Sequence, residues 1–82
     1  MKVIKRDASL VEFDGKKIYN AIMKAMKNGS GIVKPKIAES VAKEIEEEFK
    51  NDNADEVDMS DIESLVYDKL ITKKQRLTAK AY

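Results

Sequence analysis

The chain has 82 residues, enough for one small domain near the lower size limit for an independent hydrophobic core. It contains neither cysteine nor histidine, which excludes disulfides, thiolate metal sites and the commonest general base. The formal net charge is +1 and no apolar run is long enough to span a membrane, so we expect a cytoplasmic protein without general affinity for nucleic acid or membranes.

Residues 2–18 predict two short strands joined by a tight turn and followed by the start of a helix. Alternation along the first strand places Val3 and Lys5 on one face. The Asp-Ala-Ser sequence at residues 7–9 supplies the turn, because Asp and Ser hydrogen-bond their own backbone. Asp14 is expected to cap the helix that follows.

A first helix is predicted over about residues 15–28, and Gly29 is expected to end it in the left-handed conformation. Its buried stripe recurs at helical spacing and comprises Ile18, Ala21, Ile22, Ala25 and Met26. A second helix is expected to begin at Pro35, whose missing N–H costs little in the first turn. The apolar positions of that helix are Ile37, Ala38, Val41, Ala42, Ile45 and Phe49.

The acidic run at residues 46–48 fans around the second helix, which indicates a solvated face rather than a metal site. Residues 51–56 predict a polar loop that lacks the central glycine and the terminal glutamate spacing of a calcium loop.

Two capping boxes predict the last two helices, one at residues 60–63 and one at residues 72–75. In the first box, Glu63 is expected to accept a hydrogen bond from the Ser60 backbone N–H. The third helix is expected to bury Ile62, Leu65, Val66 and Leu70, and the last to pack through Leu77 and Ala81. These elements predict an α+β fold in which a small N-terminal β-hairpin packs on a four-helix bundle.

Basic residues from the first strand and from the first turn of the helix are expected close to one strand–helix corner, namely Lys5, Arg6, Lys16 and Lys17. Cations beside the free N–H groups of a helix N-terminus attract anions, but the residues alone favour ordinary surface charge over a ligand site. The Gly-Ser-Gly sequence at residues 29–31 lacks the spacing of a phosphate-binding loop. No nucleophile–base pair is suggested by the spacing of Lys, Asp and Glu, so no catalytic residue is predicted.

The run V-I-K-R-D-x-S-L-V-E-F-D-x-x-K-I at residues 3–18 resembles the opening of the ATP-cone domain. This regulatory nucleotide-binding module occurs in ribonucleotide reductases and in the bacterial repressor of their genes. The segments S-D-I-E-S-L-V and L-T-A-K-A-Y resemble the third and last helices of the same module, most closely the version in anaerobic, glycyl-radical reductases. The resemblance covers residues 1–82 and implies one ATP-cone domain whose last helix is cut short at Tyr82.

The resemblance implies a nucleotide site made of Val3, Lys5, Arg6, Asp14, Lys17 and Ile18. The three cations match positions that contact phosphates of ATP or dATP, which we expect to bind with Mg²⁺. The two apolar residues match positions that border the base and sugar, and the aspartate matches a polar position near the nucleotide.

The implied function is allosteric: the domain would bind the nucleotide and report its level to the catalytic region of a ribonucleotide reductase. It would catalyse no reaction itself. Association of the domain with a second copy of itself is a further expectation. The same domain in a transcriptional repressor and a helical interaction module without ligand are the alternatives. The family usually has glycine at the position of Ala8, which suggests a positive φ there, and some relatives place Thr and His where Met59 and Glu63 stand. Because the last helix stops at Tyr82, weak nucleotide binding is expected.

Overall fold

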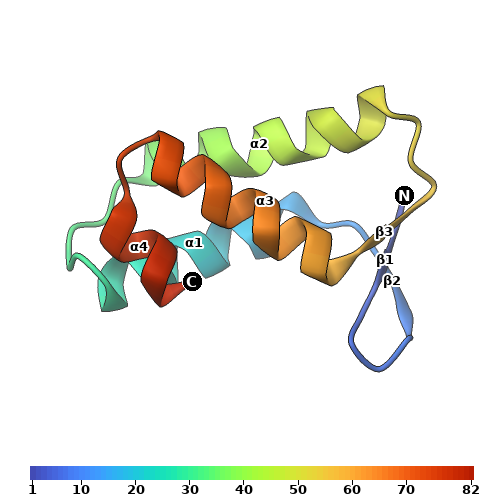
Figure 1. Ribbon diagram of the computed structural model, residues 1–82, viewed down its shortest axis with the longest axis horizontal. Helices are drawn as coiled ribbons and strands as arrows, with labels where there is room; N and C mark the ends of the chain where they lie inside the picture. Colours follow the sequence, from blue (N-terminus) through green and yellow to red (C-terminus); the bar gives the residue numbers. More distant parts are fainter.

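A three-stranded sheet lies at one end of the molecule, and four helices extend away from it (Figure 1). The computed structural model describes all residues from 1 to 82. The molecule measures 34 × 26 × 18 Å along its principal axes. The predicted α+β architecture with four helices is confirmed, and the sheet gains a strand that was not predicted. None of the helices combines the length with the apolar composition that a transmembrane span requires.

Strand β1 is the central strand of the sheet, whose order is β2-β1-β3. It pairs antiparallel with β2, where Val3 lies opposite Val11, and parallel with β3, where Val3 lies opposite Val57. The three valines form the face that packs against the helices, and Val3 and Val57 are buried. The strands are β1, Lys2–Ile4; β2, Leu10–Glu12; and β3, Glu56–Asp58.

The turn between β1 and β2 is tight and places one alanine in the left-handed region. The Ala8 N–H donates to the Lys5 carbonyl at 2.9 Å, and the Lys5 N–H donates to the Ser9 carbonyl at 2.9 Å. Ala8 has a φ of 69°, which confirms the positive φ suggested by the sequence. The Asp7 carboxylate accepts from the Ser9 N–H at 3.0 Å and from its hydroxyl at 2.6 Å, so the predicted local hydrogen bonds also form.

Helix α1, Gly15–Asn28, begins as predicted behind Asp14. The Asp14 carboxylate accepts from the Lys16 backbone N–H at 2.9 Å, the arrangement of an N-cap. Ala21 was assigned to the buried stripe but is exposed. The buried residues of α1 are Ile18, Ile22, Ala25 and Met26.

Gly29 ends α1, but its predicted left-handed conformation is wrong, since its φ is −88°. The positive φ falls two residues later, at Gly31, where φ is 77°. Gly29 is required for another reason: a Cβ there would lie 2.5 Å from the backbone oxygen of Leu77. The missing side chain lets the last helix approach the end of α1.

The hydrophobic core lies between the sheet and the four helices. Helix α2, Pro35–Asn51, packs against α1 and against α3, Met59–Thr72. Ile37, Phe49 and Leu65 are only partly buried and surround this core. The largest fully buried apolar side chains are Ile22, Met26, Val41, Ile45, Val66 and Leu70.

Ion pairs join α2 to α3 beside this core. Lys69 lies 2.7 Å from a Glu48 carboxylate oxygen and 3.5 Å from one of Glu44. Lys73 lies 2.8 Å from the other oxygen of Glu44, which also accepts from the Ser40 hydroxyl at 2.8 Å. Hydrogen bonds from Lys73 and Ser40 hold the pKa of Glu44 below its usual value.

Neither predicted capping box forms. Asp58 caps α3 instead, accepting from the Ser60 N–H at 3.1 Å, because the helix begins at Met59. Glu63 is therefore left free to bond elsewhere. Thr72 ends α3 and donates its hydroxyl to the Asp68 carbonyl at 2.9 Å, so it opens no new helix.

Helix α4, Arg76–Ala81, has no side-chain cap and packs on α1 and α3. The predicted contact through Leu77 and Ala81 is wrong, because both residues are exposed. Thr78 and Ala79 are buried in their place. The close approach at the end of α1 fixes this rotation of the short helix.

Candidate functional site

A cavity of about 320 Å³ lies where the hairpin, α1, α3 and the C-terminal residue meet. Eight of its thirteen lining residues are hydrophobic. Five of the six predicted site residues line it: Val3, Lys5, Asp14, Lys17 and Ile18. The sixth, Arg6, does not.

The local structure explains how these residues come together. Val3 and Ile18 are buried, from the central strand and from the first turn of α1, and they give the cavity an apolar floor. Lys5 lies two residues after Val3, so the strand alternation turns it to the same face. Lys17 lies in the first turn of α1, and its N–H donates to the Asp14 carbonyl at 3.1 Å.

The charged groups on the cavity wall are of both signs. Lys5 and Lys17 take part in no ion pair, which leaves both ammonium groups available to a ligand. Three carboxylates share the wall, those of Glu12, Asp14 and Glu63. The site is therefore an apolar pocket with two free cations and acidic neighbours, rather than a strongly positive surface.

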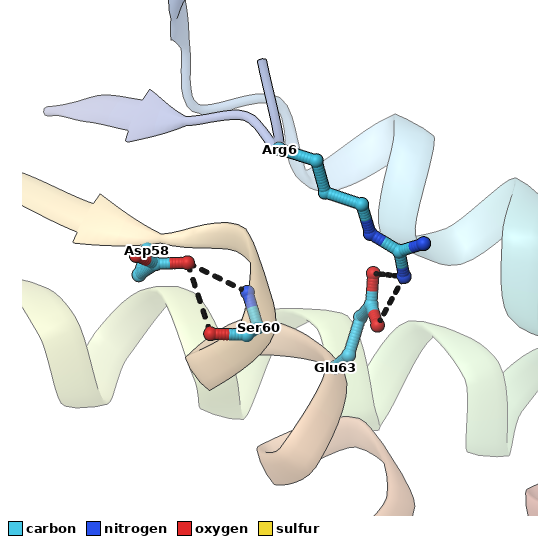
Figure 2. A network of polar contacts seen from close by, with 4 residues as sticks. All are labelled: Arg6, Asp58, Ser60 and Glu63. Atoms are coloured by element: carbon cyan, nitrogen blue, oxygen red, sulfur yellow. Dashed lines mark hydrogen bonds and ion pairs between the residues drawn. The ribbon is translucent and has the colours of Figure 1, made fainter. Parts of the chain in front are cut away.

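Arg6 lies outside the cavity and pairs with Glu63 (Figure 2). One terminal nitrogen of Arg6 lies 3.0 Å from each oxygen of the Glu63 carboxylate. The Arg6 side chain is 81% exposed and that of Glu63 is 39% exposed. The pair links the turn between β1 and β2 to α3, across 57 residues of sequence.

The wall also includes residues that were not assigned to the site from the sequence. Tyr82 is one of them, and burial, together with the negative charge of Glu63, raises the pKa of its hydroxyl. Met59 and Glu63 also line it, although the sequence marks both as departures from the family pattern and predicts only a capping role for Glu63. The position of Tyr82 depends on the rotation of α4, which the capping pattern did not predict.

A larger cavity of about 660 Å³ lies between α1 and α2 and shares Asp14 with the first. Only two of its nine lining residues are hydrophobic. Its cations, Lys16 and Lys43, face Glu39 and Glu46. Small-molecule sites are mostly apolar with a few polar groups, so the smaller cavity is the better candidate despite its size.

Comparisons with known proteins identify the family of the chain. The sequence matches the ATP cone domain over residues 1–82. It is also 34% identical over 80 residues to the anaerobic ribonucleoside-triphosphate reductase of Haemophilus influenzae (strain ATCC 51907 / DSM 11121 / KW20 / Rd). That alignment covers 98% of this chain and 11% of the reductase, so the chain spans about a tenth of its relative. The chain belongs to the ATP-cone family.

Proposed function

We propose that residues 1–82 form a regulatory domain that binds ATP or dATP and reports nucleotide levels to the catalytic region of a ribonucleotide reductase of the anaerobic type, in the cytoplasm. The observation that carries the proposal is the cavity in which Lys5 and Lys17 stand unpaired above the apolar floor of Val3 and Ile18. Family membership and the reductase relative support the same assignment.

The two parts of the cavity suit the two parts of a nucleotide. The apolar floor, with Phe13 and Met59 on the wall, would hold the base and sugar. Lys5 and Lys17 would act as point charges for the phosphates. The three carboxylates on the wall would repel a bare triphosphate, so the ligand is expected to enter as its Mg²⁺ complex, whose charge is lower.

A regulatory domain of this kind performs no chemistry. Its effect would arise because the nucleotide binds two states of the larger enzyme with different affinities. A ligand that contacted both states equally would shift nothing, however tightly it bound.

Isothermal titration calorimetry with MgATP tests the proposal on the whole chain. Charge-assisted hydrogen bonds to phosphate contribute about 1.5–3 kcal/mol each, so Lys5→Ala and Lys17→Ala should each weaken binding about tenfold or more. The matched control is Lys50→Ala, which removes an equal charge from the outer face of α2. It should leave binding unchanged.

The larger cavity is tested in the same experiment by Lys43→Ala. If Lys43→Ala abolishes binding and Lys5→Ala does not, the nucleotide occupies the cavity between α1 and α2. If all four substitutions have equal effects, the lysines are ordinary surface charge, and an interaction module without ligand becomes the better description.

A further inference from the structure

Glu63 connects the candidate nucleotide cavity with Arg6. Its carboxylate lines that cavity beside Lys5 and Lys17. It also lines a neighbouring cavity of about 380 Å³ together with Arg6 and Tyr82. Both of its oxygens lie 3.0 Å from one nitrogen of Arg6, whose side chain extends from the hairpin towards α3 (Figure 2). One side chain of α3 thus lines the cavity and binds a cation outside it.

We propose that Glu63 is an internal anion that holds Arg6 outside the cavity and competes with the phosphates of the ligand for its guanidinium group. The inference rests on the proposed function and names how the same site is regulated. Glu63 then sets the nucleotide concentration at which the site fills. Arg6 is a second source of positive charge for the ligand, since Glu63, which lines the cavity, already binds its guanidinium group.

The geometry of the ion pair makes it displaceable. Arginine binds carboxylate and phosphate most strongly through two parallel N–H···O bonds, whereas here one nitrogen serves both oxygens. Arg6 is 81% exposed, so water screens the pair, and exposed pairs of this kind are weak. A phosphate chain carries more charge than one carboxylate and offers arginine the fork geometry that Glu63 does not use.

Displacement of Glu63 from Arg6 by a phosphate would also remove a contact between the hairpin turn and α3. Arg6 lies in the turn between β1 and β2, and Glu63 lies on α3, so their ion pair ties the hairpin turn to α3. When a phosphate takes Arg6, that tie is released. Occupancy of the cavity would thereby alter how the hairpin sits against α3, which is the kind of two-state difference that a regulatory ligand needs.

The test is calorimetry with two ligands, MgATP and adenosine, on the wild-type chain and three variants. Glu63→Gln keeps the size of the side chain and removes its charge, and it should tighten MgATP binding about fivefold. Adenosine has no phosphate, so its affinity should not change. Arg6→Ala combined with Glu63→Gln should lose most of the gain, because the freed guanidinium is its source.

Glu48→Gln is the matched control, because Glu48 pairs with Lys69 as Glu63 pairs with Arg6, but lines neither the candidate nucleotide cavity nor the cavity beside Arg6. It removes an equal charge from an ion pair and should change MgATP affinity less than twofold. Circular dichroism establishes that each variant is folded before titration.

Each outcome decides the matter. The inference is overturned, and the proposed function kept, if the wild-type chain binds MgATP and Glu63→Gln binds it no more tightly. It is also overturned if Glu63→Gln changes adenosine affinity as much as MgATP affinity, or if Glu48→Gln gives the same gain. If no chain binds either ligand, the proposed function fails and the inference fails with it.

Discussion

Ala8→Gly is predicted to stabilise the domain, because Ala8 holds a conformation that suits glycine. Its φ of 69° lies in the left-handed region, where an L-residue with a Cβ costs about 1–2 kcal/mol. Ala8 is exposed, so removal of its methyl group sacrifices no core contact. Its N–H bond to the Lys5 carbonyl is a backbone interaction and is retained.

The size of the gain follows from two opposing effects. Glycine relieves the backbone strain but gives the unfolded chain more freedom, which costs about 0.4–1 kcal/mol. The two ranges differ by about 0–1.6 kcal/mol, so the central expectation is a net stabilisation of about 0.8 kcal/mol. A change of 1 kcal/mol moves the melting temperature of a domain of this size by about 4–8 °C, so the central value corresponds to a rise of about 3–6 °C.

Urea unfolding followed by circular dichroism measures the change, with an unaltered dependence on urea concentration as the sign that only stability has shifted. Two substitutions serve as controls. Asn53→Gly removes a residue that tolerates its φ of 54°, and it should change stability little. Ala21→Gly acts in the middle of α1 at an exposed position and should cost about 1 kcal/mol. A neutral or destabilising Ala8→Gly, alongside the expected loss from Ala21→Gly, would refute the strain argument.

Two further predictions concern packing and pH. Gly29→Ala should destabilise the domain by about 1–3 kcal/mol, because the added Cβ would lie 2.5 Å from the Leu77 carbonyl oxygen. An unchanged midpoint of urea unfolding would contradict this prediction. The hydrogen bond from Lys73 is the largest cause of the lowered pKa of Glu44. The ionised Glu44 therefore stabilises the folded state at pH values above 4.5, the ordinary pKa of a glutamate. This stabilisation is lost as the pH falls below 4.5, because the unfolded chain takes up the proton at a higher pH than the folded chain. The free energy of unfolding of Glu44→Gln should therefore fall less than that of the wild type between neutral pH and about pH 3.5. The difference should be less than about 1 kcal/mol, because the Glu44 side chain is 41% exposed and water screens its ion pairs. Equal losses in the two chains would exclude this contribution.

The strongly periodic parts of the fold could be predicted from the sequence, and the non-local parts could not. Helix α1 begins behind Asp14 and ends at Asn28 as expected, because the cap and the apolar stripe are local signals. Strand β3 was missed because it holds a single apolar residue, Val57, between two acidic ones. What makes it a strand is the free edge of β1, which lies far away in the sequence.

The candidate site shows the same division. Strand alternation and helix position, which are local rules, predict that Lys5 and Lys17 lie at one strand–helix corner, and the family resemblance assigned them to a ligand site; both line the cavity. The partner of Arg6 could not be predicted, since Ser60 and Glu63 match a capping box and that pattern gives Glu63 a different role. Asp58 took over the cap and left the carboxylate of Glu63 to Arg6.

The central position of β1 has a consequence for the order in which the chain folds. The β1–β2 hairpin can close within microseconds, but two strands alone are barely stable in water. The second partner of β1, residues 56–58, is synthesised only after α1 and α2. During synthesis on the ribosome, the edge of β1 that pairs with β3 therefore stays unpaired until residues 56–58 have emerged. Closing the long loop between β1 and β3 costs conformational entropy before the contacts between the two strands form, so docking of β3 is expected late in folding. Val3, which lies opposite Val57 and forms part of the cavity floor, is then covered only at this late step.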